Sequence, residues 1–245
     1  MYNSSNSFNN FTQDQYESVS VSRTFVASVF SWMFAALAIT AIFAYYFSTS
    51  ETFLNLMFTS SAGRVGMSTL GWVIMFAPLG FVLLMSFGYN RLSGTALTLL
   101  FIIYSIIMGM SLSFIFLVYS LGSIYLTFAI TAGTFGVMAV LGYTTKIDLT
   151  KFGSIMLMGL IGIIIASLVN FFLKSEMMSY IISVIGVLVF TGLTAYDVQK
   201  IKRIGASIEL GSESAKKMAI MGALTLYLDF INLFLFLLRL FGGRK

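Results

Sequence analysis

Two aspartates stand inside apolar stretches of this sequence, where a charged side chain has few ways to be satisfied. Asp197 lies in FTGLTAYDVQKIKR (residues 190–203), and Asp229 lies in TLYLDFINLFLFLLR (residues 225–239). A charge at the centre of a bilayer costs about 2.5 to 3.5 kcal/mol, and such residues usually face a protein interior or a water-filled cavity. These two residues are therefore the candidates for chemistry in this chain.

The chemistry of an aspartate pair depends on whether the two side chains meet. Carboxyl groups a few ångströms apart in a low dielectric cannot both ionise, so they titrate as one coupled unit. Such a pair would sense pH without a histidine, which this chain lacks. Once deprotonated, it would offer hard oxygen ligands to Ca²⁺, which takes about six to eight oxygens, at most four of them from two carboxylates. Tyr227, Asn232, backbone carbonyls or water would complete a weak calcium site.

Each aspartate also has a simpler interpretation. Asp197 could pair with Lys200, one helical turn further on, at the surface of the membrane. Asp229 lies about 15 Å from either end of its apolar segment, too deep to reach water, and could be a neutral acid bonded to a neighbouring Ser, Thr or Asn. Because the two acids lie on consecutive segments that a hairpin connection makes neighbours, we favour the pair.

The composition identifies the class of protein that must position these residues. The chain is 58% hydrophobic and 9% charged, with a mean hydropathy of +0.95, whereas soluble domains are about a quarter charged. The absence of Cys and His excludes disulfides, thiol catalysis and Ser-His triads. The net charge of +5 is assigned to basic loops rather than to a nucleic-acid partner. We predict an integral membrane protein with no enzymatic activity.

Seven apolar segments are long enough to cross a hydrocarbon core about 30 Å thick, which takes roughly 20 residues in a helix. Scattered Gly and Ala favour helices over barrel strands, so the fold class is all-α. Residues 1–24 are predicted as a disordered polar tail, residues 25–241 as the transmembrane domain and residues 242–245 as a short basic C-terminus. The predicted helices are residues 25–47, 66–87, 95–119, 124–143, 152–173, 177–198 and 218–241.

Loop charges and small residues give further predictions. A cytoplasmic N-terminus places nine of the 14 Lys and Arg residues in internal segments, as the positive-inside rule favours. The pairs Gly162 with Ala166 and Ala132 with Gly136 have the small-xxx-small spacing of close helix contacts.

The two aspartate-bearing segments resemble the closing signature of a known family. TGLTAYDVQKIK and LTLYLDFINLFLFLLRLFGG are similar to the last two helices of the Bax-inhibitor family, also called transmembrane Bax inhibitor motif proteins. GYTTKIDLTKFGS (residues 142–154) and LIGIIIASLVNFFL (residues 160–173) resemble its bacterial members. The similarity extends from about residue 20 to the end of the chain.

The resemblance implies a fold and an activity. Six helices are expected to surround a central seventh, in a multi-pass protein of the bacterial inner membrane. The implied activity is a pH-sensitive Ca²⁺ leak across the lipid bilayer, with no tightly bound cofactor. Asp197 and Asp229 would gate the pore, closed when bridged and open when separated. Arg91 is the candidate for the basic gate partner at the end of the second helix, and Asn170 matches a polar position of the fifth.

Two other functions are alternatives to the Ca²⁺ leak. A regulator without transport activity would bind a membrane protease or a stress-response partner, with the N-terminal tail as its contact. An intramembrane aspartyl protease would fit Tyr196 and Asp197, but Leu226 and Leu228 stand where its glycines precede the second acid. Its Pro-Ala-Leu motif is also missing, because Pro78 is the only proline.

Overall fold

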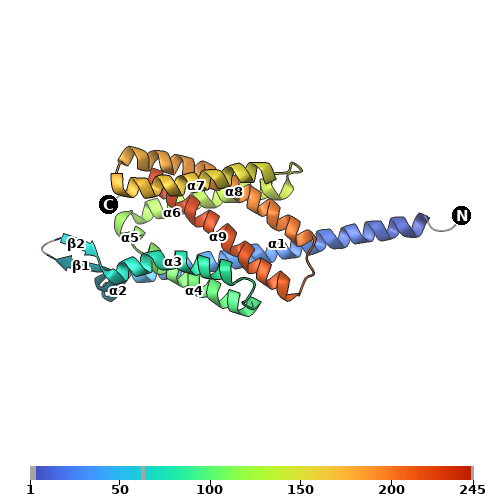
Figure 1. Cartoon of the computed structure of the whole chain (residues 1–245), viewed down its shortest axis with the longest axis horizontal. Helices are drawn as coiled ribbons and strands as arrows, with labels where there is room; N and C mark the ends of the chain where they lie inside the picture. The colour runs from blue at the N-terminus through green and yellow to red at the C-terminus, as the bar shows by residue number, and fades with distance from the viewer. Residues whose placement is uncertain (1–3, 62–63, 244–245) are drawn as a thin grey trace.

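The protein is a bundle of long helices with one small hairpin (Figure 1). The computed structural model describes residues 4–61 and 64–243, with residues 4–19, 60–61 and 64–65 as backbone only. The elements run in the order α1 (Ser4–Thr49), α2 (Glu51–Met57), β1 (Phe58–Ser61), β2 (Arg64–Met67), α3 (Thr69–Gly88), α4 (Gly94–Leu112), α5 (Ile115–Val118), α6 (Leu121–Thr144), α7 (Thr150–Leu173), α8 (Glu176–Ala206) and α9 (Glu213–Phe241).

Serine caps begin six of these helices. In each, the serine hydroxyl oxygen accepts a hydrogen bond from the backbone N–H three residues later, which satisfies one of the free donors of the first turn. Such caps stop the chain from continuing the preceding helix and allow very short connections. The capping residues are Ser50, Ser68, Ser93, Ser120, Ser175 and Ser212.

The long helices form two groups of three with α9 between them. α4 packs against α1 and α3, while α8 packs against α6 and α7. α9 contacts α1 and α4 on one side and α6 and α8 on the other, and it runs obliquely through the bundle (Figure 1). Within residues 4–61 and 64–243, seven helical segments are long and apolar enough to cross a membrane, so the all-α transmembrane class is confirmed.

α9 is the most buried of the seven segments. In its most apolar 18-residue stretch 67% of the residues are buried, compared with 17% in α3 and 6% in α7. Its extensive contacts are with four of the other six segments. A complete ring of six helices around α9 therefore stays a prediction.

Several boundaries differ from those expected. α1 begins at Ser4 and continues through the segment predicted as a disordered tail, where no Gly or Pro interrupts a helix. An antiparallel hairpin, β1 with β2, precedes α3 and pairs Phe58 with Met67. The connection between the helices predicted at residues 177–198 and 218–241 is shorter than expected and covers residues 207–212, because α8 ends at Ala206 and α9 begins at Glu213.

The extension of α8 has a packing cause. Ile201, which is 4% exposed, and Gly205 continue the buried face of α8 beyond its apolar part. A side chain at position 205 would crowd Phe25 of α1, which shows how closely the two helices approach. The charged residues between these positions have good helix propensity, so the helix continues as long as this packing does.

Close helix contacts form at glycines other than those predicted. Among the described residues, no atom of a neighbouring residue lies within 4 Å of a Cβ built on Gly136 or Gly162, so the small-xxx-small prediction is wrong for both glycines. Instead, a Cβ on Gly142 of α6 would clash with the backbone of Ala195 on α8, and one on Gly153 of α7 would clash with the ring of Tyr196. These two glycines hold α6 and α7 tightly against the part of α8 that carries Asp197.

We expect Gly142→Ala to destabilise the bundle by about 1 to 3 kcal/mol, because the new methyl meets rigid backbone rather than a flexible side chain. The matched control is Gly136→Ala in the same helix, which has open space and gains up to about 1 kcal/mol of helix propensity. Unfolding of the purified protein in detergent measures both. Equal stability of the two variants would contradict the contact.

Candidate functional site

The carboxyl groups of Asp197 on α8 and Asp229 on α9 lie within hydrogen-bonding reach of each other at the interface of these helices. Asp197 is 9% exposed and Asp229 is 4% exposed. A hydrogen bond between two carboxyl groups needs a proton on one of them, because an ionised carboxylate only accepts. The two residues singled out in the sequence are therefore neighbours, and a hydrogen bond between them requires one of the two carboxyl groups to be protonated.

The surroundings of the pair offer little other neutralisation. Oδ2 of Asp229 is buried, and no described residue donates a hydrogen bond to it. Lys200 acts on Asp197 through its charge, but it is exposed and forms no ion pair in the part of the chain that the structure describes. The alternative of a surface pair between Asp197 and Lys200 is therefore not the arrangement found.

The two aspartates lie at different distances from the ends of their helices. Asp197 precedes Ala206 by nine residues and Asp229 follows Glu213 by sixteen, which at 1.5 Å per residue are about 14 Å and about 24 Å. In a tilted helix, a given length along the helix axis spans a smaller depth of the membrane. The oblique course of α9 (Figure 1) accommodates this difference and lets the carboxyl groups meet.

Tyr227 does not face the aspartate pair. Thr40 of α1 has one hydroxyl hydrogen, which it donates to the carbonyl of Ser105 at 2.9 Å. The Tyr227 hydroxyl, 2.7 Å from Thr40 Oγ1, must therefore donate to that oxygen. The Tyr227 side chain therefore faces α1 rather than the pair. Tyr227 and Asp229 are two residues apart on α9, and residues with this spacing point to different sides of a helix.

The other predicted site residues also have separate partners. Asn232 donates to the carbonyl of Leu228 in its own helix, at 2.8 Å. Asn170 joins the ends of α7 and α8, because Nδ2 donates to Ser179 Oγ at 2.7 Å and Oδ1 accepts from the amide of Ser175 at 3.0 Å. Ser179 precedes Asp197 by 18 residues on α8, or about 27 Å. Asn170 therefore stabilises a turn far from the pair.

Arg91 lies in the turn after α3, and its side chain is exposed. It forms no ion pair with either aspartate within residues 4–61 and 64–243. The structure therefore does not bring Arg91 to the pair, and its role as a gate partner stays a prediction.

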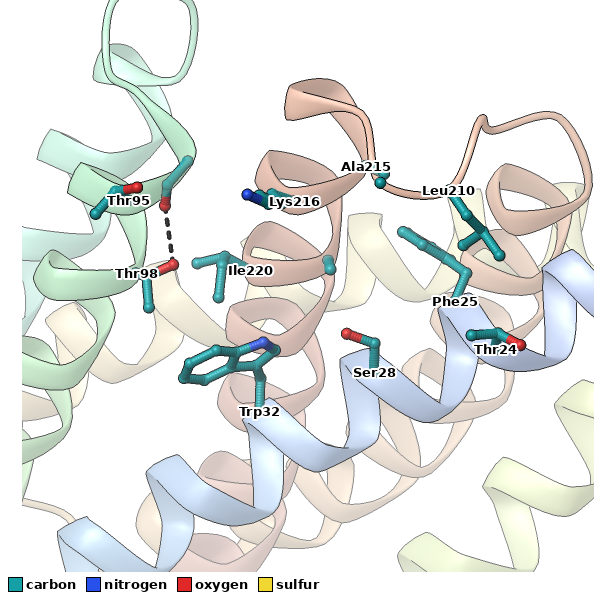
Figure 2. Close-up of a pocket in the computed structure, with 13 residues that line it drawn as sticks. Thr24, Phe25, Ser28, Trp32, Thr95, Thr98, Leu210, Ala215, Lys216 and Ile220 are labelled. Carbon is teal, nitrogen blue, oxygen red and sulfur yellow. Dashed lines mark hydrogen bonds between the residues drawn. The ribbon is translucent and has the colours of Figure 1, made fainter.

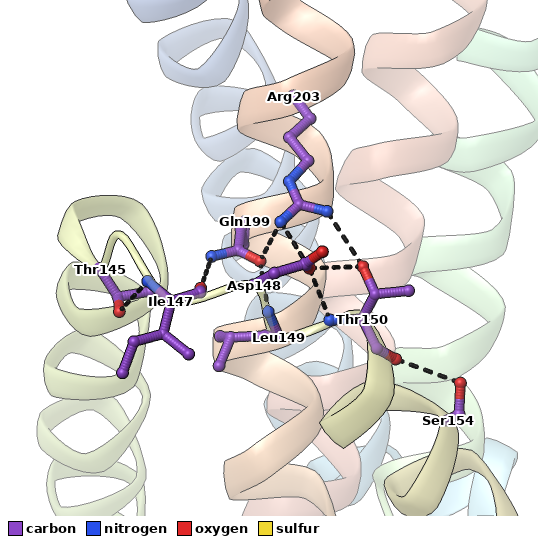
Figure 3. Close-up of polar contacts among 8 residues, drawn as sticks. All are labelled: Thr145, Ile147, Asp148, Leu149, Thr150, Ser154, Gln199 and Arg203. Atoms are coloured by element: carbon purple, nitrogen blue, oxygen red, sulfur yellow. Dashed lines mark hydrogen bonds and ion pairs between the residues drawn. The ribbon is translucent and has the colours of Figure 1, made fainter.

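A polar network that sequence analysis missed lies close to the pair on α8 (Figure 3). Gln199 donates from Nε2 to the carbonyl of Ile147 at 2.8 Å, and its Oε1 accepts from the amide of Leu149 at 2.9 Å. Arg203 donates to Asp148 at 2.6 Å and to the Thr150 hydroxyl at 3.0 Å. Together these bonds attach the loop between α6 and α7 to α8. The sequence signal that could have indicated this network is a Gln and an Arg four residues apart, shortly after Asp197.

Asp148, the acid of this network, does not titrate in the physiological range. Hydrogen bonds from the Thr150 hydroxyl, from Arg203 and from the Thr150 amide hold the pKa of Asp148 well below its usual range. Because folding lowers this pKa, ionised Asp148 stabilises the fold at pH values above its unfolded pKa of about 3.9. This stabilisation is lost only as the pH falls below that value. Between about pH 5 and pH 8 Asp148 stays ionised, so a pH response in this window must arise elsewhere.

A cavity beside α9 is separate from the pair. It measures about 550 Å³ and lies between α1, α4 and α9, with Trp32, Thr98 and Lys216 among its lining residues (Figure 2). Neither aspartate lines it. Ile220, in its wall, precedes Asp229 on α9 by nine residues, or about 14 Å. The conformation described here therefore keeps the pair apart from this cavity.

These features define a seven-helix membrane protein with a buried carboxyl pair, and comparison with known proteins identifies its family. The model of the family described as inhibitor of apoptosis-promoting Bax1 matches residues 22–245. Inner membrane protein YbhL of Escherichia coli K12 is 47% identical over 91% of this chain and 93% of its own. A protein of Borreliella burgdorferi is 45% identical over 96% and 97%, and protein RP147 of Rickettsia prowazekii is 44% identical over 91% of both chains. The chain belongs to the Bax inhibitor family.

We expect Gln199→Leu to release the loop between α6 and α7, because the Ile147 carbonyl and the Leu149 amide lose their partner. At about 1 kcal/mol for each bond, the detached population rises by roughly 5- to 30-fold. Limited trypsin cleavage after Lys146 and Lys151 measures this release. Thr144→Val is the control, because its hydroxyl bonds only within α6. Equal cleavage of both variants would show that Gln199 does not hold the loop.

Proposed function

We propose that this protein is a cation leak channel of the bacterial inner membrane, with Ca²⁺ as its ion, and that the Asp197–Asp229 pair gates it by pH. The observation that carries the proposal is the buried contact of two carboxyl groups between α8 and α9. The inner membrane is inferred from the name of the Escherichia coli relative, inner membrane protein YbhL. A cytoplasmic N-terminus follows from the distribution of basic residues.

The gate follows from the charge of the pair. With one shared proton, the pair carries one negative charge and a hydrogen bond holds α8 against α9. Loss of that proton leaves two negative charges in contact in a low dielectric, and their repulsion drives the helices apart unless a cation enters. Alkaline conditions therefore favour the open state, and acidic conditions favour the closed one.

The ion selected by the open pair would be a hard cation. Two carboxylates supply at most four of the roughly six to eight oxygens that Ca²⁺ takes. Tyr227 and Asn232 are engaged elsewhere, so water and backbone carbonyls are the remaining ligands. No group of three or more acidic, His or Cys side chains forms a metal cluster in the described part of the chain. A weak site of this kind suits passage of an ion rather than its storage.

We expect Ca²⁺ flux into liposomes that hold the purified protein to rise between pH 5 and pH 8, by up to about tenfold per pH unit for one linked proton. Asp197→Asn and Asp229→Asn remove the shared titration, so their flux should lose this pH dependence. Glu209→Gln is the control, because this acid is exposed in the connection between α8 and α9 and forms no ion pair within residues 4–61 and 64–243. Unchanged flux and pH response in both pair variants would overturn the gate.

One observation favours a second candidate function, a regulator that binds a membrane protease or a stress-response protein. The N-terminal part of α1 extends beyond the other helices (Figure 1), where a partner can reach it. This segment is polar and carries Asp14 and Glu17. Such a role requires no ion flux, but it does not exclude one.

We expect deletion of residues 2–18 to leave the flux and its pH response unchanged, because the pair and its supporting glycines lie in other helices. The deletion keeps Ser22, whose hydroxyl donates to the carbonyl of Lys202 at 2.9 Å. Flux in liposomes and co-purification of membrane proteins from cells are measured side by side. A full-length protein without flux, whose partners are lost on deletion, would favour the regulator over the channel.

A further inference from the structure

A basic pocket lies at one end of the bundle, between α1, α6 and α8. Its volume is about 290 Å³. Its walls combine three cationic side chains with hydroxyl and amide groups, and none of the lining residues is acidic. The lining residues are Ser22, Tyr143, Thr145, Lys146, Gln199, Lys202, Arg203 and Ala206.

The charge of the pocket is only partly compensated. Asp148 pairs with Arg203 at 2.6 Å, and this is the only ion pair among residues 4–61 and 64–243. Lys146 is exposed and has no side-chain hydrogen bond or ion pair to another described residue. The excess of two positive charges therefore comes from Lys146 and Lys202.

Lys202 is fixed in place with hydrogen-bonding capacity left over. Its Nζ donates to the carbonyl of Tyr143 at 2.6 Å and lies 4.8 Å from the centre of the Tyr143 ring. An ammonium group has three N–H donors, so two remain for a ligand. The pocket thus presents a positioned ammonium group, and a single phosphate would accept from it.

The surface next to the pocket is apolar and exposed. Val140 of α6 is 62% exposed and lies one helical turn before Tyr143, on the same side of the helix. Leu141 is 51% exposed and Ile147 is 72% exposed. α6 ends at Thr144, so the lipid-facing part of the helix stops where the basic residues begin. An occupant that bears both a phosphate and acyl chains matches this arrangement.

We infer that the basic pocket binds the phosphate headgroup of an anionic lipid, whose acyl chains lie along the exposed face of α6. Basic pockets between transmembrane helices recognise such headgroups. The inference goes beyond the proposed leak, because it involves neither aspartate of the pair and does not require ion flux.

The test is native mass spectrometry of the full-length protein in detergent, titrated with phosphatidylglycerol or with phosphatidylcholine. Each removal of a lysine charge should weaken phosphatidylglycerol binding about fivefold, so the variants are Lys146→Gln and Lys202→Gln. Lys146 has no side-chain bond to lose, so its replacement leaves the fold intact. Lys151→Gln is the matched control, an exposed lysine nearby that does not line the pocket.

The inference is supported if phosphatidylglycerol binds more tightly than phosphatidylcholine, if both pocket variants bind it more weakly and if Lys151→Gln binds as the parent does. Full binding by Lys146→Gln would overturn it, as would an equal loss in the Lys151 variant. A further arm adds 10 mM inorganic phosphate. Displacement of the lipid by this salt would assign the pocket to a soluble anion instead.

Discussion

A carboxyl pair buried among membrane helices persists only while a proton or a cation offsets part of its charge. The contact of Asp197 with Asp229, between the extensively packed helices α8 and α9, is therefore conditional. Burial makes the condition strict, because water does not screen charges at this depth. The proposed gate requires the surrounding helices to accommodate both a joined and a separated pair.

The packing around the pair is uneven in a way that fits this requirement. Gly142 and Gly153 hold α6 and α7 close to the segment of α8 that carries Asp197, where a single added methyl would meet neighbouring atoms. Asp229, by contrast, lies in a helix between two groups of helices and packs against both. Under the proposed gate, separation of the pair would therefore move α8 together with α6 and α7 relative to α9.

Composition and apolar length predicted the seven membrane segments, because hydrophobic thickness constrains every spanning helix in the same way. The aspartate pair was also predictable, since a deep charge is rare enough to be informative. The contacts of Tyr227 and Asn170 were not, because the direction of a side chain depends on the rotation of its helix and on which helix lies opposite. The same reason separates Gly142, which forms a contact, from Gly136, which does not. The full lengths of α8 and α9 depended on packing by residues such as Ile201, outside any apolar run.

α8 is continuous from Glu176 to Ala206, so Asp197, Gln199 and Arg203 belong to one stiff rod. The loop between α6 and α7 is attached to that rod two to six residues beyond the aspartate. A displacement of α8 at Asp197 therefore also moves the points at which Gln199 and Arg203 hold the loop. If attachment of the loop changes the proton affinity of the pair by some factor, the proton changes the attachment by the same factor. Attachment of the loop and protonation of the pair would then be linked through a single helix.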